Sequence, residues 1–300
     1  MPRPRLPALL LTPGALGLIR DVFGAGELVG NSHRIRRRIV AWGPHARPLT
    51  LDHSAAVISE DELLQSLQER DSASNNSRAD HGAWSVFASR PLPPAAIEHA
   101  FGSRPAFTAQ VNLKKTSDSE ACWIESLDEG WLFLISCAER CGLLLSVGFE
   151  PDRLLSRSIL IARHIEDVSS LVSRFPAYPR IVSPLCGPGW LACGSAAMAF
   201  DPICGDGTAH AIRQAILAAA VIRAASSNEK DQLLSHYEAR LTAGFQRHLM
   251  LCRQFYASGG DGAWWRAELE ALESGIAWCD AKLSGARFNY QLDGFDLQRV

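Results

Sequence analysis

GWLACGSAAMAFDPICGDGT, residues Gly189–Thr208, runs directly into the alanine-rich segment AHAIRQAILAAAVIRAA, residues 209–225. The apolar residues Trp190–Cys193 predict a short strand. The residues from Gly194 to Thr208 include three glycines and a proline, which predict a loop. The alanine-rich segment is apolar almost all round, which is typical of a buried helix. The sequence therefore predicts a strand, a loop of small residues and a buried helix, in this order.

The start of the predicted helix is suited to a ligand that carries or gains negative charge. The first turn of a helix leaves backbone N–H groups without partners inside the helix, and the helix dipole places its positive end there. In this chain those groups lie at 205–209, where Gly205 and Gly207 leave room for close approach. We therefore expect a binding site at this turn. A serine-hydrolase elbow is excluded, because Ser195 is not flanked as Gly-x-Ser-x-Gly requires.

Three short motifs follow one another here: Gly194-Ser195-Ala196-Ala197, Asp201-Pro202 and Gly205-Asp206-Gly207. In order and spacing they resemble the second flavin-contacting motif of the FAD-dependent monooxygenases and tryptophan-halogenase-like oxidoreductases, a branch of the glutathione-reductase-type flavoproteins. The resemblance implies a bound FAD, with its ribityl chain at the first motif and its pyrimidine end at the glycine turn. The cofactor-binding residues that it implies are Gly194, Ser195, Ala196, Asp201, Pro202, Gly205, Asp206, Gly207 and Thr208.

The resemblance also implies an α/β (α+β) fold. It is a truncated FAD/NAD(P)-binding fold of the glutathione-reductase type, with an antiparallel substrate-domain sheet and a C-terminal helical region. The implied domains are a discontinuous residual FAD-binding domain (1–30, 59–105 and 181–225), a substrate-binding sheet (31–58 and 106–180) and C-terminal helices (226–300).

Local patterns predict the individual elements. From Phe107 onward apolar and polar residues alternate, which predicts several short strands joined by turns, in a sheet with one buried face. Thr12-Pro13 begins a predicted helix that reaches Phe23, and Ser59 caps an acidic helix with Glu62 in the capping-box position. We also expect helices at 95–101 and 151–172.

A dinucleotide-binding unit would need a strand, Gly-x-Gly-x-x-Gly and a helix, and no segment of the sequence has this order. Gly24-Ala25-Gly26 with Gly30 comes nearest, but a helical segment precedes it and no apolar helical face follows. We therefore interpret it as a glycine-capped helix end and a loop. The resemblance then implies a chain that lacks the N-terminal ADP-binding unit. A shortened gene product, a start assigned too late and loss in this lineage are the alternatives.

The chain departs from the family pattern at three places. Ser195 stands where the family has Asp, Glu60 lies where it usually has Arg, and 87–90 replaces a frequent Asp-Ala-x-Gly. At 131–136 the chain also lacks the halogenase signature Trp-x-Trp-x-Ile-Pro, which disfavours halogenation.

Two functional hypotheses follow. The first is an FAD-dependent oxidoreductase, monooxygenase-like, that acts on a small aromatic or apolar substrate and takes electrons from NAD(P)H or from a partner reductase. The second is a degenerate, non-catalytic relative that serves as a binding or partner protein. Neither hypothesis assigns a catalytic residue.

Composition excludes several other classes. A net charge of -2 and a charged content of 21% do not indicate a nucleic-acid partner. No apolar run reaches the roughly 18 residues that a membrane span needs. The eight cysteines form no Cys-x-x-Cys pair and predict reduced thiols in a cytoplasmic protein, and the nine histidines show no ligand spacing, so no metal is expected.

Overall fold

The computed structural model of the protein describes residues 7–24, 30, 32–71, 84–225 and 229–300. Its contacts divide the chain into two compact units. Unit 1 comprises Met1–Asn75, Ser103–Ala177 and Gln254–Leu269, and unit 2 comprises Asn76–Gly102, Tyr178–Arg253 and Glu270–Val300. This division follows contact density, whereas the predicted domains are defined by what they bind and stay a prediction.

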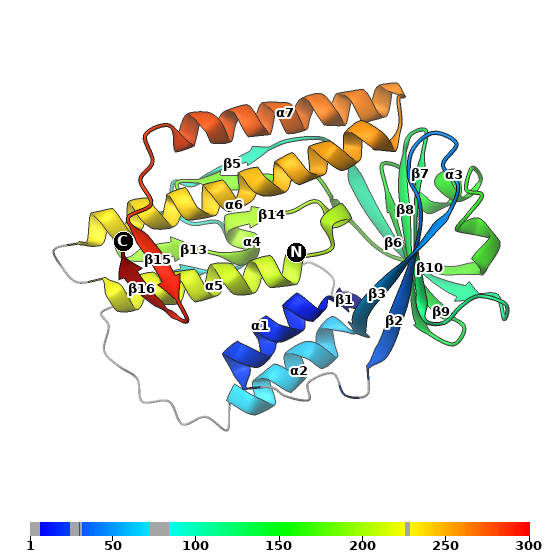
Figure 1. Ribbon diagram of the computed structural model, residues 1–300, viewed down its shortest axis with the longest axis horizontal. Coiled ribbons are helices and arrows are strands. Elements are labelled where there is room, and N and C mark those ends of the chain that lie inside the picture. Colours follow the sequence, from blue (N-terminus) through cyan, green and yellow to red (C-terminus); the bar gives the residue numbers. More distant parts are fainter. Residues whose placement is uncertain (1–6, 25–29, 31, 72–83, 226–228) are drawn as a thin grey trace. The chain divides into compact units, whose positions relative to one another are not determined.

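Unit 1 is built on an eight-stranded, strongly curled sheet with the order β1-β3-β2-β7-β8-β9-β6-β10 (Figure 1). Its strands are β1 (Leu9–Leu11), β2 (His33–Ala41), β3 (Leu49–Ile58), β6 (Pro105–Leu113), β7 (Ala121–Leu127), β8 (Gly130–Ala138), β9 (Cys141–Val147) and β10 (Ile165–Pro176). The expected antiparallel sheet is present, with one parallel pair, β2 and β7, that the sequence did not predict.

The expectation of a single buried face is wrong for this sheet. Successive residues of one strand point to opposite faces. Trp123 and Leu134 belong to one buried apolar cluster, whereas their neighbours Cys122 and Ile135 belong to another. Both faces of the central strands are therefore covered, and the strands are apolar nearly throughout for that reason.

The two helices at the start of unit 1 are capped as predicted. Helix α1 (Pro13–Phe23) begins after Thr12, whose hydroxyl accepts the Ala15 amide at 3.3 Å, and it ends at Gly24 with φ of 61°. Helix α2 (Glu60–Asp71) has a complete capping box, since the Ser59 amide donates to the Glu62 carboxylate and the Glu62 amide donates to the Ser59 hydroxyl. The two helices lie side by side (Figure 1). The rest of the glycine motif, at 25–29, lies outside the described residues.

The helix expected at 151–172 is wrong. Only α3 (Pro151–Leu155) and a 3₁₀ turn, η1 (Ala162–His164), are helical, and β10 then pairs with β6 over its whole length. Serines and β-branched residues such as Val168 and Val172 have weak helix propensity, and the free edge of β6 offers backbone partners. The pairing carries three register shifts, which explains the irregular pattern in the sequence.

Unit 2 contains short strands and long helices. Its strands are β4 (Ser85–Phe87), β5 (Ile97–Ala100), β11 (Arg180–Ser183), β12 (Cys186–Gly187), β13 (Trp190–Ala192), β14 (Met198–Ala199), β15 (Tyr290–Asp293) and β16 (Asp296–Arg299). They form the sheets β14-β11-β5 and β12-β13-β4 and the hairpin β15-β16. The helix expected at 95–101 is wrong, because 97–100 pairs with β11.

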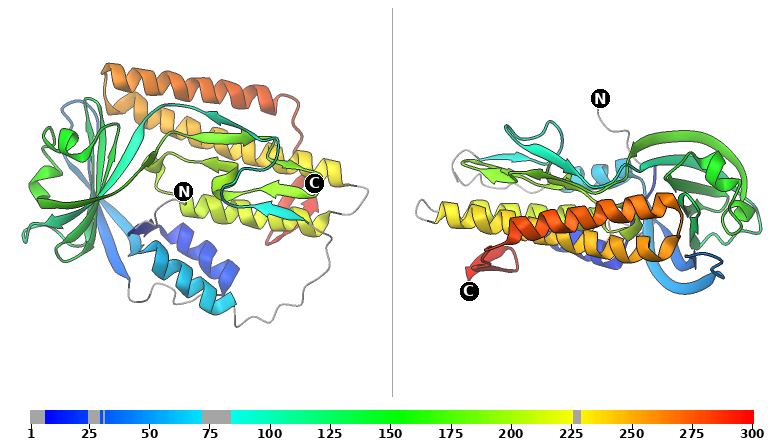
Figure 2. Two further views of the ribbon diagram at one scale, coloured as in Figure 1. Left: turned by 180° about the vertical axis from the view of Figure 1, so that it is seen from behind. Right: turned by 90° about the horizontal axis from the view of Figure 1, so that it is seen from above.

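Helix α5 (Gly207–Ala224) is the helix expected after the glycine loop. Helices α6 (Lys230–Gly259) and α7 (Ala263–Leu283) supply the expected C-terminal helical region, which ends in the hairpin β15-β16 and not in a helix. Residues of α6 and α7 belong partly to unit 1. Within unit 2, the short strands form a layer over α5 and α6 (Figure 2), and the Tyr237 hydroxyl of α6 donates to the Ala192 carbonyl of β13 at 2.6 Å. No helix among the described residues is both long enough and apolar enough to cross a membrane.

Helix α5 is not buried all round, contrary to the prediction. Ala209, Gln214, Ala218, Ala220 and Val221 are buried, while Arg213, Ala215, Ala219 and Arg223 are exposed. Alanine is small and is common on both the buried and the exposed faces of helices. An alanine-rich sequence therefore does not show which face of the helix is buried.

A buried ion pair fixes the helical segment 254–269 within unit 1. Arg104 pairs with Glu268, and their side chains are 0% and 4% exposed. The second Glu268 oxygen accepts the Ser103 amide at 3.2 Å and the Ser103 hydroxyl at 3.3 Å. The Arg104 guanidinium also lies over the Tyr256 ring, 4.5 Å from its centre.

We expect Glu268→Ala to lower the free energy of unfolding by about 3–5 kcal/mol, because it leaves a buried guanidinium without its counter-charge. Urea unfolding monitored by tryptophan fluorescence measures this loss. The control is Glu166→Ala, which removes the half-exposed partner of Arg140 and is expected to cost under about 1 kcal/mol. Equal losses in the two variants would contradict the role given to the buried pair.

Candidate functional site

The site begins where β13 ends. β13 pairs in parallel with β4 and antiparallel with β12. After the extended residue Cys193, the chain turns into the four-residue helix α4 (Gly194–Ala197). Part of the predicted loop is therefore helical, and it turns sharply because Gly194 has a φ of 53°.

Gly194 has close neighbours on two sides. Its amide donates to the Gln214 side-chain oxygen of α5 at 2.8 Å, and a Cβ at this position would lie 2.9 Å from the Ala88 carbonyl oxygen. Residues with a side chain rarely adopt this backbone conformation. The position therefore requires glycine for two independent reasons.

Ser195 and Ala196 face the same backbone segment. The Ser195 hydroxyl, which is exposed, donates to the Ala88 carbonyl oxygen at 3.3 Å, and the Ala196 amide donates to the same oxygen at 3.3 Å. Ala196 is fully buried. The hydroxyl proton of Ser195 is thus used within the protein, while its oxygen keeps lone pairs that can accept a hydrogen bond.

Asp201 and Pro202 form a second turn. Asp201 is 2% exposed and caps the 3₁₀ helix η2 (Pro202–Cys204), since its carboxylate accepts the Ile203 amide at 2.9 Å. Pro202 occupies the first position of η2, where a missing N–H costs nothing. The turn ends at Gly205 with a φ of 62°, and the Gly205 amide donates to the Pro202 carbonyl at 3.0 Å.

The start of α5 is open and lacks a side-chain cap. Asp206 holds the N-cap position of α5, but its side chain makes no capping hydrogen bond. Its carboxylate instead accepts from Arg213 at 3.1 Å and lies 3.8 Å from the His210 ring. A Cβ built on Gly205 or on Gly207 would meet no atom within 4 Å. Gly207 and Thr208 are the first residues of the helix, so their amides have no earlier turn to bind.

His210 lies one turn into α5 and packs on Phe200, with 4.3 Å between the ring centres. Burial, only partly opposed by Asp206, lowers the pKa of His210. The imidazole is therefore neutral near pH 7, and it adds no positive charge to the helix start.

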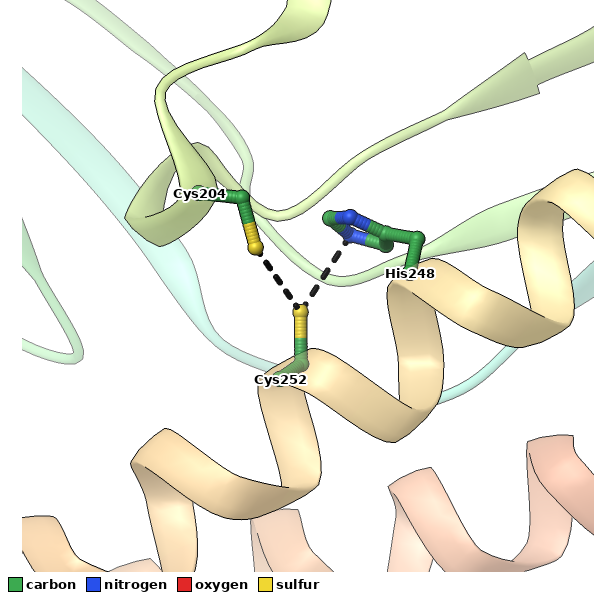
Figure 3. A group of neighbouring side chains, drawn as sticks. All are labelled: Cys204, His248 and Cys252. Carbon is green, nitrogen blue, oxygen red and sulfur yellow. Dashed lines mark hydrogen bonds between the residues drawn. The ribbon is translucent and has the colours of Figure 1, made fainter.

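Sequence reasoning missed a group that the structure assembles beside this turn. Cys204, at the end of η2, lies with its sulfur 3.7 Å from that of Cys252 on α6 (Figure 3). The Cys252 sulfur is 3.3 Å from Nε2 of His248, and this nitrogen accepts the Asp201 amide at 2.8 Å. The hydrogen bond to Cys252, aided by His248, lowers the pKa of the Cys204 thiol to about 6.

Unit 1 contains a cavity of about 370 Å³ that none of the predicted cofactor-binding residues lines. Glu125 reaches it, but this buried carboxylate is engaged by the amides of 159–161 at 2.8–2.9 Å and by the Ser158 hydroxyl. Glu125 therefore organises the loop 158–161.

The fold has relatives among solved structures. No protein-family model matches the sequence, and no curated protein matches it. CmlS, a flavin-dependent halogenase, aligns with a TM-score of 0.71 and 16% identity over 95% of this chain and 65% of its own. QhpG, a peptidyl tryptophan dihydroxylase essential for tryptophylquinone cofactor biogenesis, aligns with a TM-score of 0.70 and 18% identity over 87% of this chain and 70% of its own.

A third neighbour is HpxO of Klebsiella pneumoniae, whose structure holds FAD and uric acid. It aligns with a TM-score of 0.60 and 15% identity over 92% of this chain and 87% of its own. The chain has the fold of FAD-dependent halogenases and monooxygenases. This confirms the α/β fold class that the resemblance implied, whereas the loss of an ADP-binding unit stays a prediction. The chain spans slightly less than two thirds of CmlS.

We expect Gly194→Ala to lower the free energy of unfolding by about 1–2 kcal/mol from the left-handed backbone alone, with the Ala88 contact adding to the loss. Gly207→Ala is the matched control. Its position is helical and open, so alanine is expected to leave stability unchanged or to raise it by up to about 1 kcal/mol. Chemical unfolding of both variants measures the difference, and a stable Gly194→Ala protein would show that the turn is not constrained.

Proposed function

We propose that the protein is an FAD-dependent oxidoreductase, monooxygenase-like, that acts on a small aromatic or apolar substrate. The observation that carries the proposal is the open start of α5, where Asp206 leaves the helix uncapped and two glycines leave space at the backbone. A fold shared with flavin-dependent enzymes supports it.

The residues at this turn fit the flavin end of FAD by the chemistry of their donors. A helix N-terminus favours negative charge, by up to about 2 kcal/mol in a partly buried setting, and a reduced flavin gains negative charge on its pyrimidine ring. Gly205, Gly207 and Thr208 would offer the backbone, and Asp201 and Pro202 would hold the turn in shape. Gly194, Ser195 and Ala196 would hold the ribityl chain, with the Ser195 oxygen as an acceptor.

Bound FAD would supply the electron transfer and oxygen chemistry, and the protein would supply position and electrostatics. The neutral His210 adds no charge there, and the backbone amides at the start of α5 supply positive potential at this turn. The proposed substrate class is supported by two neighbours that involve ring compounds. QhpG is a peptidyl tryptophan dihydroxylase, and the structure of HpxO holds uric acid. NAD(P)H, or a partner reductase, is the proposed electron donor.

The alternative proposal is a relative that keeps the fold without the cofactor and serves as a binding or partner protein. Ser195 favours it, because this side chain cannot supply the negative charge of the family's aspartate and its proton already binds Ala88. FAD binding separates the two proposals.

We expect the purified full chain to bind FAD, and Gly207→Leu to weaken binding on the order of tenfold or more, because the side chain fills the open space at the helix start. Quenching of FAD fluorescence on titration with protein measures the affinity. Ala215→Leu, on the exposed face of the same helix, is the control and should bind FAD as the wild type does.

Thermal unfolding without FAD should be similar for the two leucine variants, which separates a filled site from a damaged fold. Wild-type protein without measurable FAD affinity would discard the oxidoreductase proposal and leave the binding-protein alternative. Unchanged affinity in Gly207→Leu would remove the glycine turn from the cofactor site.

A further inference from the structure

Three side chains with metal-binding atoms meet in unit 2. His248 and Cys252 are four residues apart on α6, so they lie on one face of the helix. Cys204 reaches them from η2, which comes 48 residues before Cys252 in the sequence. The three ligand atoms all lie within 4.8 Å of one another, and Figure 3 shows the side chains pointing toward one another.

Two of the three distances between the ligand atoms are close to the edges of a tetrahedral zinc site, and the third is within 4.8 Å. Zinc binds a cysteine sulfur at about 2.3 Å and a histidine nitrogen at about 2.0–2.1 Å, which places two sulfurs roughly 3.8 Å apart and a sulfur and a nitrogen roughly 3.6 Å apart. The observed separations are 3.7 Å between the sulfurs and 3.3 Å from the Cys252 sulfur to Nε2. The two sulfurs and Nε2 are therefore spaced closely enough for one ion, once Nε2 releases its present partner.

A disulfide fits the arrangement less well. It would need the two sulfurs at about 2.0 Å, far closer than the 3.7 Å observed. Two sulfurs with one imidazole nitrogen form a soft donor set of the kind that selects zinc over magnesium or calcium.

Burial supports a preformed site. Cys252 is fully buried and His248 is 4% exposed, and Cys204 is half-buried. The neighbouring protein therefore holds two of the three ligands in place, and three protein ligands leave one position of a tetrahedral ion for water or another ligand.

Metal binding would cost one hydrogen bond. Nε2 of His248 accepts the Asp201 amide at 2.8 Å, and an ion on Nε2 would take the same lone pair. One neutral hydrogen bond contributes little beside the bonds of a metal to two thiolates.

We propose that Cys204, His248 and Cys252 bind a soft divalent cation, of which zinc is the type, through two sulfurs and Nε2. The site differs from the proposed flavin turn and does not require FAD. The sequence predicted no metal, because its spacing shows only the pair on α6 and conceals the third ligand.

The test uses the full chain, freed of metal with a chelator under reducing conditions and then dialysed against Zn²⁺ alone. We expect one zinc per chain by elemental analysis. Cobalt(II) added in place of zinc should give a thiolate-to-metal absorption band in the near ultraviolet and the intense visible bands of a tetrahedral ion. This measurement on the wild-type protein needs no variant to fold.

Mutation of a residue that only hydrogen-bonds to a metal ligand weakens metal binding by roughly 10–100-fold. Cys204→Ser removes a ligand itself, so it should weaken zinc binding by more than this. Competition with a coloured chelator measures the affinity. Cys279→Ser is the control, since Cys279 is a free thiol of unit 2, more buried than Cys204, and lies outside the cluster. It should keep one zinc per chain.

Wild-type protein that binds less than one zinc per chain, or cobalt protein without the thiolate band, would overturn the proposal. Unchanged affinity in Cys204→Ser would overturn it as well. A disulfide joining Cys204 and Cys252 in protein that takes up no zinc would assign the pair to redox chemistry instead.

Discussion

The close approach of backbone at Gly194 is the constraint on which the arrangement of the candidate site depends. Here the end of β13, the segment after β4 and the helix α5 come within contact distance, since Gly194 binds Gln214 through its amide and leaves no space for a Cβ beside Ala88. The same crowding accounts for the small buried residues around it, such as Ala192 and Ala196. Larger residues at these positions would push the strand layer away from α5.

A second feature is the partner of the Asp206 carboxylate. An aspartate before a helix commonly caps it and cancels part of the positive potential at its start. In this chain the carboxylate pairs with Arg213 along the helix and leaves the first amides uncapped. Two exposed glycines beside these amides make them accessible. The uncapped amides at the start of α5 therefore contribute positive potential to the turn.

Helix α6 contacts the turn η2 at both of its ends. Asp201 uses its carboxylate to cap η2 and its amide to bind His248, and Cys204 at the other end of η2 contacts Cys252. Both ends of a three-residue turn are thus held by the same helix. Any change at His248 or Cys252 reaches the proposed flavin turn through these two contacts.

The sequence by itself determined the features that depend on neighbours in the chain. These include the Thr12 cap of α1, the box between Ser59 and Glu62, and the alternating residues of β6, because each rests on residues within a few positions of one another. The fold class followed from the resemblance of three short motifs to those of a known flavoprotein family. The caps and the strand alternation are local signals, so they can be recognised without any tertiary information.

The tertiary structure alone decided the rest. The segment 165–176 became a strand because the edge of β6 offered partners, and 97–100 did so because β11 lay beside it. The second buried face of the large sheet and the exposed face of α5 depend on what packs against them. Cys204, His248 and Cys252 met only when η2 docked on α6. In each case the deciding contact joins residues that are far apart in the sequence, so the spacing of residues along the chain does not predict it.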